Sequence, residues 1–237
     1  MSLLLDPLHR RLLEQLGVPS GSRALEVGCG NGSVAAWLAG RVGSAGEVVA
    51  VDLDLSLTSA AAGVEFRQAD ILAGPVAPGN FDLVTCRAVL HHVGDVATAL
   101  ANLLGSARPG ATVLVIEPDF LPVGIAEPRG VRDFWQGWLA WSLDQGIDYF
   151  LGRRLPQLLS AAGAADVGAI AETALYNGGS PWASYWQQTI RQLRPRLQDS
   201  GKLDNESIDS FLARSADPNW WTQTIAFTAA YGRVRGG

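Results

Sequence analysis

The chain has 237 residues, of which 48% are hydrophobic and 17% charged, a composition typical of a globular protein with a sizeable core. Its formal net charge of −5 argues against a nucleic-acid partner, because neutralising phosphates needs a concentrated basic face. No apolar stretch approaches the roughly 18 residues of a membrane span, and the two cysteines form no disulfide pattern. We therefore expect a cytoplasmic protein without a membrane or nucleic-acid partner.

The first half of the chain alternates apolar runs with helical patterns. A first helix is predicted with Asp6 as N-cap and Pro7 at its first position. It carries His9 on its surface and ends at Gly17. Strands are predicted at residues 23–27, 47–51, 64–70, 81–86 and 112–117, and helices at residues 33–39 and after Asp95. Strands that alternate with helices predict a parallel sheet covered on both faces.

The second half is rich in aromatic residues. Val131, Trp135 and Trp138 share one face of a predicted helix, and a later helix carries Trp186 but is expected to bend or shorten at Pro195. Asp204 is predicted to cap a further helix, and closing strands are expected near residues 164–176 and 222–232. We expect one domain, composed of an N-terminal helix (1–20), a ligand-binding half (21–120), helical cap elements (121–160 and 178–218) and closing strands (161–177 and 219–237).

A glycine-rich turn connects the first strand to the next helix. Glycines at 28, 30 and 32 allow positive φ angles and let a ligand lie against bare backbone at a helix N-terminus. A dinucleotide site would need a further glycine where this chain has Ser33. Glu26, just before the turn, would repel a pyrophosphate but attract an ammonium group. The turn therefore favours a nucleotide-like ligand that carries an amino group.

Four further motifs follow the turn, at residues 51–52, 68–71, 81–84 with 90–93, and 108–111. In this order they resemble the class I S-adenosylmethionine-dependent methyltransferases, in the small-molecule branch that includes quinone C-methyltransferases and natural-product O-methyltransferases. The resemblance covers about residues 20–120, with residues 155–163 and the last strand also similar. It implies an α/β, Rossmann-like fold with a seven-stranded, mostly parallel sheet and an aromatic-rich helical insertion after the fifth strand.

The resemblance also implies a set of cofactor-binding residues. Asp52 would accept hydrogen bonds from the ribose hydroxyls, Asp70 from the adenine amine, and Glu26 would orient the turn or the methionine amino group. The full set is Glu26, Gly28, Cys29, Gly30, Asn31, Asp52, Leu53, Asp70, Ile71 and Arg87. For Arg87, binding of a substrate acid and a plain salt bridge are also open. The product of the cofactor would be S-adenosyl-L-homocysteine.

One segment departs from the family pattern. Only eleven residues separate Asp52 from Val64, too few for an ordinary helix with two loops. We expect a short turn there, with Leu55, Leu57 and Thr58 as the adenine wall.

Methyl transfer to a hydroxyl needs alignment and a base. His91 follows the fourth strand at the carboxyl edge of the sheet and is the candidate base; a capping or packing role is the alternative. His92 and Glu117 are placed at the substrate, with structural roles also open. The substrate-binding aromatics are predicted to be Trp135, Trp138 and Tyr149, although they could equally pack the insertion onto the sheet. No metal-ligand spacing is present.

These residues predict methyl transfer from S-adenosylmethionine to a small, largely apolar metabolite. An O-methyltransferase of secondary metabolism with a histidine base is favoured, acting as a monomer or homodimer. The alternatives are a C- or N-methyltransferase of quinone or polyketide type, and a protein of this fold that catalyses a cyclisation or binds the cofactor without transferring a methyl group. A dehydrogenase is disfavoured because the third dinucleotide glycine is missing.

Overall fold

The computed structural model describes residues 2–126 and 128–236, with the side chains of residues 2 and 3 left out. The chain divides into two compact units. The larger unit contains Ser2–Glu117, Gly152–Ile170 and the chain from Thr228 onward. The smaller unit contains Pro118–Leu151 and Ala171–Phe227.

A seven-stranded sheet organises the larger unit, in the order β3-β2-β1-β4-β5-β9-β6. The β1–β2, β1–β4, β2–β3 and β4–β5 pairs are all parallel. This confirms the predicted seven-stranded, mostly parallel sheet. Its strands are β1 (Arg23–Val27), β2 (Glu47–Asp52), β3 (Val64–Gln68), β4 (Phe81–Arg87), β5 (Ala107–Asp119), β6 (Ala165–Glu172) and β9 (Ala226–Arg233).

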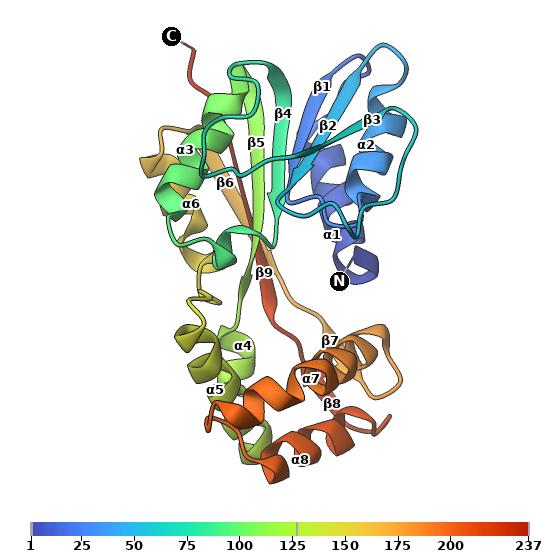
Figure 1. Ribbon diagram of the computed structural model, residues 1–237, viewed down its shortest axis with the longest axis vertical. Coiled ribbons are helices and arrows are strands. Elements are labelled where there is room, and N and C mark those ends of the chain that lie inside the picture. The colour runs from blue at the N-terminus through green and yellow to red at the C-terminus, as the bar shows by residue number, and fades with distance from the viewer. Residues whose placement is uncertain (1, 127, 237) are drawn as a thin grey trace. The chain divides into compact units, whose positions relative to one another are not determined.

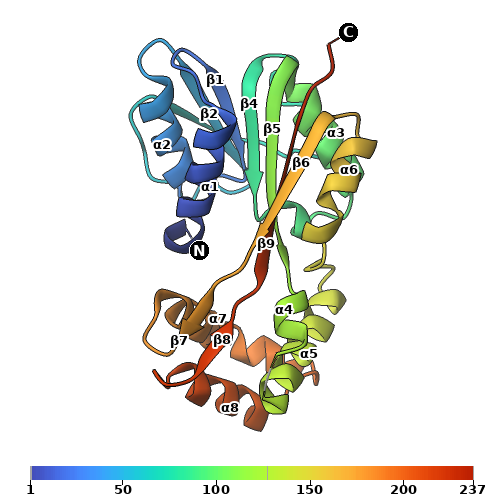
Figure 2. The ribbon, with the colours of Figure 1, turned by 180° about the vertical axis from the view of Figure 1, so that it is seen from behind.

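Helices cover both faces of this sheet. Helices α1 (Ser2–Leu16) and α2 (Ser33–Val42) lie on one face, and α3 (Val96–Ser106) and α6 (Leu155–Ala161) lie on the other (Figures 1 and 2). The central strands are buried on both faces, which explains why β2 is an unbroken apolar run closed by Asp52. As predicted, Asp95 caps α3 by accepting a hydrogen bond from the Thr98 amide.

The first helix differs from its prediction. It begins at Ser2, so Pro7 lies inside it and Asp6 is not its N-cap. The Asp6 carboxylate instead pairs with Arg87 on β4 and with Arg10, one turn further along the helix. His9, predicted on the surface, is fully buried. The capping interpretation was wrong because the partner of Asp6 is distant in sequence and invisible to a local pattern.

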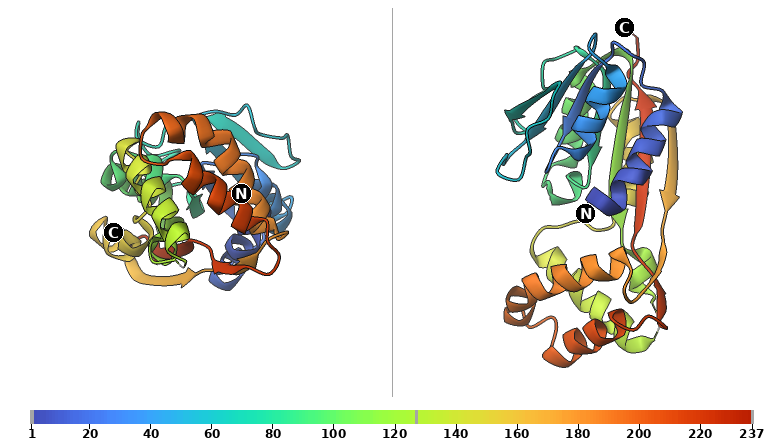
Figure 3. Two further views of the ribbon diagram at one scale, coloured as in Figure 1. Left: turned by 90° about the horizontal axis from the view of Figure 1, so that it is seen from below. Right: turned by 90° about the vertical axis from the view of Figure 1, so that its right-hand side faces the viewer.

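The smaller unit is built mainly from helices. Helices α5, α7 and α8 pack together (Figure 3), and β7 pairs antiparallel with β8. Asp204 caps α8 as predicted, whereas α7 continues through Pro195 and is not shortened there. Its elements are α4 (Leu121–Gly124), α5 (Arg129–Asp144), β7 (Leu175–Asn177), α7 (Pro181–Asp199), α8 (Asn205–Ser215) and β8 (Trp221–Gln223).

The two predicted closing strands are each divided in two. Strands β6 and β9 join the large sheet, while β7 and β8 form a separate two-stranded sheet. At the divisions, the Thr224 amide donates to the Ala174 carbonyl and the Thr173 hydroxyl donates to the Thr224 carbonyl. The sequence pattern is continuous through these points because both halves of each strand have β character; only the choice of partner changes.

Candidate functional site

The glycine turn leaves β1 and is anchored to β2. The amides of Gly28 and Cys29 both donate to the Val51 carbonyl, at 2.8 and 3.1 Å. Gly28 and Gly30 have φ angles of 73° and 52°, a region that favours glycine. A Cβ on Gly28 would lie 2.0 Å from a methyl carbon of Val89, whereas a Cβ on Gly30 would meet nothing within 4 Å. Gly28 is therefore required for packing, and Gly30 leaves backbone open to a ligand.

A cavity of about 480 Å³ lies at the carboxyl ends of β1, β2 and β4. Seven residues predicted at the ligand line it: Gly28, Gly30, Asp52, Leu53, Asp70, Ile71 and His92. The segments 88–89 and 93–94 line it too and were missed. The sequence held a signal for them, because β4 was predicted to end beside β1 at the same edge of the sheet.

The two strand-end aspartates face this cavity while also supporting local backbone. Asp52 accepts a hydrogen bond from the Gly30 amide at 2.8 Å and one from the Asp54 amide at 3.3 Å. Asp70 accepts from the Leu72 amide at 2.8 Å. Each carboxylate has further lone pairs to offer, so the turn-capping role does not exclude contact with a ligand hydroxyl or amine.

The short segment after Asp52 contains no helix, as predicted. It is held to the glycine turn because the Thr58 hydroxyl donates to the Gly30 carbonyl at 2.8 Å. Leu53 lines the cavity yet remains 64% exposed. The cavity wall on this side is therefore a loop with an exposed apolar side chain.

Glu26 is buried directly behind the turn. Its carboxyl group accepts a hydrogen bond from the Ala35 amide in the first turn of α2, but its Oε2 has no partner among the described residues. Burial raises the pKa of Glu26 to about 8, although the nearby Arg87 guanidinium opposes the shift. A buried carboxyl oxygen without a partner, beside a bare glycine turn, fits a ligand ammonium group.

Four predicted cofactor residues do not line the cavity: Glu26, which lies behind the turn, and Cys29, Asn31 and Arg87. Arg87 forms a salt bridge with Asp6 at 2.9 Å, which was one of the alternatives for it. Cys29 is buried, and burial raises its thiol pKa to about 11, so that it is a neutral thiol at neutral pH. The Asn31 side chain is exposed and accepts a hydrogen bond from the Ser33 amide at the start of α2.

The two adjacent histidines have different surroundings. His91 is buried, and its Nδ1 lies 2.6 Å from Oε2 of Glu117, the last β5 residue in the larger unit. Glu117 also accepts hydrogen bonds from the amides of residues 89, 90 and 91, which fixes the turn that carries both histidines. His92 faces the cavity, and its partly enclosed position, together with the neighbouring imidazole, lowers its pKa to about 4.

The predicted substrate aromatics belong to the smaller unit. Trp135 and Trp138 are each 1% exposed, with rings 6.1 Å apart, in a cluster that includes Trp186. Packing, the alternative to substrate contact, is therefore what the structure shows for these two rings. Tyr149 stacks on Phe120 at 4.0 Å and lines a second cavity of about 490 Å³, formed by residues 139–150 and mostly apolar.

The described part of the chain contains no cluster of three or more histidine, cysteine or acidic side chains able to hold a metal ion. None of its helices has the length and hydropathy that a bilayer crossing needs.

The chain is similar in sequence to known methyltransferases. A family model described as a methyltransferase domain matches residues 2–168. The chain is 37% identical over 116 residues to an uncharacterized methyltransferase of Mycobacterium tuberculosis, covering 46% of this chain and 57% of that one. It is 30% identical over 169 residues to the ubiquinone biosynthesis O-methyltransferase of Methylococcus capsulatus, covering 60% and 70%.

The fold is shared with solved structures at low sequence identity. Phosphoethanolamine N-methyltransferase 2 of Haemonchus contortus, in complex with S-adenosylhomocysteine, aligns at a TM-score of 0.62 and 15% identity, covering 98% of this chain and 53% of that one. The family match extends over more than half of the chain. The chain therefore belongs to the methyltransferase family, in its class I, S-adenosylmethionine-dependent branch.

Proposed function

We propose that this protein transfers a methyl group from S-adenosylmethionine to an oxygen atom of a small, largely apolar metabolite. The observation that carries the proposal is the 480 Å³ cavity, where Asp52, Asp70 and the bare Gly30 backbone meet at one edge of the sheet. When bound, S-adenosylmethionine supplies an electrophilic methyl group on a sulfonium. Asp52 would hold the ribose hydroxyls, Asp70 the adenine amine, and Glu26 the ammonium group.

An apolar acceptor is supported by the smaller unit. Its cavity of about 490 Å³ is lined by Leu139, Leu143, Ile147, Tyr149 and Phe150, a composition suited to a planar or aliphatic molecule. The net charge of −5 disfavours a nucleic-acid acceptor. Similar proteins include both an O-methyltransferase and a C-methyltransferase of quinone biosynthesis, so oxygen is proposed here on the carboxylate-held histidine, a base suited to a hydroxyl proton, and not on these similarities.

His91 is the proposed general base, and Glu117 positions it. The carboxylate 2.6 Å from Nδ1 fixes the orientation of the imidazole and stabilises it once a proton has been taken up. This arrangement of a buried carboxylate behind a histidine is the same division of roles that carboxylate–histidine pairs have in other enzymes. His92, without such a carboxylate, is assigned to the cavity wall.

Calorimetry with S-adenosylmethionine and S-adenosylhomocysteine tests cofactor binding. Incubation with labelled methyl donor and a panel of phenolic and enolic metabolites tests methyl transfer. Label attached to oxygen in the product supports the proposal, and label on carbon or nitrogen replaces it with the alternative acceptors. Conversion of an acceptor without label points to a cyclase, and absence of cofactor binding contradicts the whole assignment.

His91→Ala is expected to lower kcat about 10²- to 10⁴-fold while leaving the Kd for cofactor nearly unchanged. The matched variant is His92→Ala, which removes the adjacent imidazole but no carboxylate-held base, and it should have the smaller effect on kcat. Full activity of His91→Ala across the pH range would remove His91 from the mechanism.

A further inference from the structure

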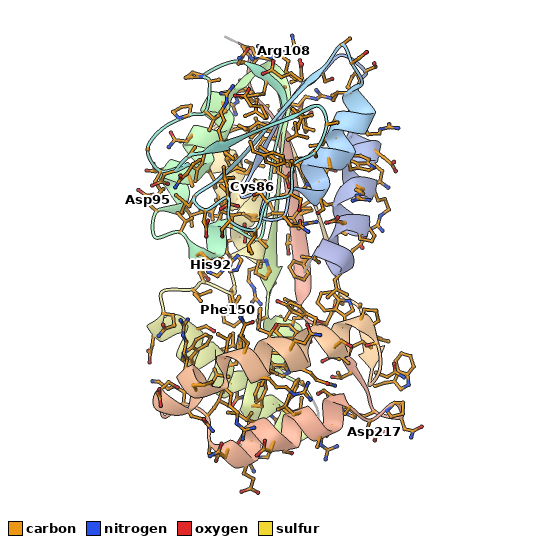
Figure 4. All side chains as sticks on the ribbon, turned by 45° about the vertical axis from the view of Figure 1, so that its right-hand side comes forward. Cys86, His92, Asp95, Arg108, Phe150 and Asp217 are labelled. Carbon is orange, nitrogen blue, oxygen red and sulfur yellow. The ribbon has the colours of Figure 1, made fainter. Side chains whose placement is uncertain are left out.

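A third cavity, of about 510 Å³, lies in the larger unit at the amino ends of β1, β4 and β5 and beside the end of β9. We call it the amino-edge cavity. Asp82 near the start of β4 lines it, whereas Ala88, just after β4, lines the 480 Å³ cavity. The extended chain between these two residues spans roughly 20 Å at about 3.3 Å per residue. Figure 4 shows Arg108, another residue of the amino-edge cavity, at the opposite end of the larger unit from His92. The amino-edge cavity is therefore separate from the proposed cofactor site.

Two arginine side chains are fixed at the amino-edge cavity. The pairing of β4 with β5 shifts register near the start of β4, so that residues 108–111 loop out opposite Asp82. Arg108 on this loop pairs with Asp82, and Nη1 of Arg233 donates to the Gly110 carbonyl at 3.0 Å. A guanidinium has five N–H donors, and each of these contacts uses only part of them. Both arginines therefore keep donors for a ligand.

Two hydroxyl groups open into the same cavity. Ser22, just before β1, and Thr112 on β5 both line it, although these residues are only 6% and 9% exposed. Neither hydroxyl has a hydrogen-bond partner among the described residues, and neither is sealed off within the protein. Enclosed polar groups nearly always have a partner, so these two are unusual. They add two donors to those of the arginines.

The lining of the cavity favours an anion with several oxygen atoms. Its ionisable side chains are two guanidinium groups and one carboxylate, so the cavity is net positive in a chain whose net charge is −5. Donors that converge from β5, from β9 and from the chain before β1 suit a tetrahedral anion, whereas one guanidinium fork satisfies a planar carboxylate. Bare backbone also borders the cavity, at glycines where a Cβ would meet nothing within 4 Å: Gly17, Gly21 and Gly110. The volume is that of a small-molecule site and exceeds what the anion alone needs.

We propose that the amino-edge cavity binds the phosphate group of a small metabolite, as a second ligand site outside the methyl-transfer chemistry. Arg108 and Arg233 donate to the phosphate oxygens, and the hydroxyls of Ser22 and Thr112 donate to them from the enclosed side. The bare backbone of the glycines leaves room for the organic part of the ligand. Asp82 holds Arg108 in position but also lowers the affinity, because its carboxylate repels the anion.

The competing explanation is that the two arginines only fasten the looped-out residues of β5. Both explanations predict that Arg108→Met destabilises the protein, so stability alone does not separate them. They differ for Asp82→Asn. Loss of a purely structural ion pair leaves anion binding unchanged, whereas at an anion site the loss of the carboxylate strengthens binding.

A nuclear magnetic resonance titration measures binding at this cavity. Inorganic phosphate is added at constant ionic strength, and the chemical shifts of the Gly17, Gly21 and Gly110 amides are followed. The wild type should show saturable shifts with a Kd of about 0.1–5 mM, and acetate should bind at least about fivefold more weakly. Glycerol 3-phosphate should bind at least as tightly as inorganic phosphate, because the cavity has room beyond the anion.

Three variants should change the affinity in opposite directions. Arg233→Met and Thr112→Val each remove donors, and they should raise the Kd for phosphate about 10-fold and about 3- to 5-fold, respectively. Asp82→Asn removes the repelling carboxylate, while its amide oxygen can still accept from the Arg23 amide, a contact of 2.8 Å in the wild type. This variant should lower the Kd about 3- to 10-fold.

Two matched control variants should leave the Kd for phosphate unchanged. Thr228→Val removes a hydroxyl from a residue of β9 that is also only 6% exposed but does not line the cavity. Arg67→Met removes an arginine of β3 that pairs with Glu65 at the surface, away from the cavity lining.

The absence of saturable shifts up to about 50 mM phosphate would overturn the inference. So would a Kd that is the same in the wild type, Asp82→Asn and Thr112→Val, and so would exclusion of glycerol 3-phosphate by a protein that binds the free ion. Saturating S-adenosylhomocysteine should leave the Kd for phosphate within about twofold; strong competition would place the phosphate in the 480 Å³ cavity instead. Failure of the methyl-transfer proposal would leave this site unaffected, because none of its residues takes part in that proposal.

Discussion

The two units of this chain use their buried side chains in opposite ways. The larger unit has an aliphatic core and concentrates charged groups at one edge of its sheet, around Glu26, Asp52 and Arg87. The smaller unit is filled by aromatic rings, and seven of the chain's eight tryptophans follow residue 134. Charged groups at a strand end point to a ligand chemistry, whereas rings that pack on one another point only to a core. This is why the sequence predicts the cofactor side in more detail than the acceptor side.

The largest expected effect tests whether the aromatic core is independent of the cofactor cavity. Trp135 contacts the rings of Phe134 and Trp186 with centroids 5.2 and 4.8 Å away, so Trp135→Ala leaves a large void and should lower the free energy of unfolding by about 3–5 kcal/mol. The free energy of cofactor binding should change by less than about 0.5 kcal/mol, because the cavity residues belong to the larger unit.

Urea unfolding and calorimetry on the same samples check this. Trp221→Ala, at a position that is 62% exposed, is the control and should barely change stability. A parallel loss of cofactor affinity in Trp135→Ala would show that the two units are energetically coupled.

The second effect concerns the buried carboxyl group of the larger unit. Glu26 has a folded-state pKa of about 8, above its unfolded value, so the unfolded chain loses this proton first as pH rises. The free energy of unfolding of the cofactor-free wild type should therefore fall between about pH 5 and pH 8 relative to Glu26→Gln, by on the order of 2–4 kcal/mol in total.

Thermal or urea unfolding of both proteins at several pH values measures the difference. With saturating cofactor the wild type should instead have the higher free energy of unfolding of the two proteins. The amide introduced by Glu26→Gln has no charge to offer the ammonium group of the cofactor. A difference that does not depend on pH would mean that Glu26 is already ionised in the folded protein.

A third effect separates the two glycines of the turn. Gly28→Ala combines a positive φ with a clash against Val89 and should cost about 2–3 kcal/mol of stability. Gly30→Ala has the φ cost alone, about 1 kcal/mol, but places a methyl group at the cavity. We expect Gly30→Ala to lose more cofactor affinity relative to its loss of stability. Urea unfolding measures the loss of stability and calorimetry the loss of cofactor affinity. The same ratio of the two losses in both variants would contradict this division of roles.

The smallest effect compares one helix cap from each unit. Asp95 caps α3 in the larger unit and Asp204 caps α8 in the smaller unit, each through a backbone amide three residues later. Replacing either with Ala should cost about 1 kcal/mol. If the units unfold in separate steps, followed by circular dichroism and tryptophan fluorescence, each variant should shift a different step. A common shift would mean that the chain unfolds as one cooperative body.

What the sequence could predict depended on how local the signal was. Asp70 and both helix caps accept hydrogen bonds from amides two or three residues away, and the structure has these residues where they were expected. The start of α1, the burial of His9 and the partner of Arg87 depend on contacts between residues about 80 positions apart. No periodicity encodes such a pairing, because the polar residues involved have the same local appearance as solvent-exposed ones.

The acceptor side could not be predicted for a different physical reason. An aromatic residue on a helix face gives the same pattern whether it touches a substrate or another ring. Trp135 and Trp138 are buried against other rings, while Tyr149 lines a cavity, and all three were predicted together. The division of the closing strands was missed because pairing partners, rather than β propensity, change at residues 173–174 and 224–225.

The position of β9 has a consequence for the order in which the chain can fold. It is the last strand of the described residues, yet it lies inside the sheet, between β5 and β6. Until residues 226–233 leave the ribosome, β5 therefore keeps an unpaired edge and β6 has no place in the sheet. Exposed edges of this kind recruit strands from other chains, so the nascent protein is prone to aggregation until residues 226–233 have emerged and paired.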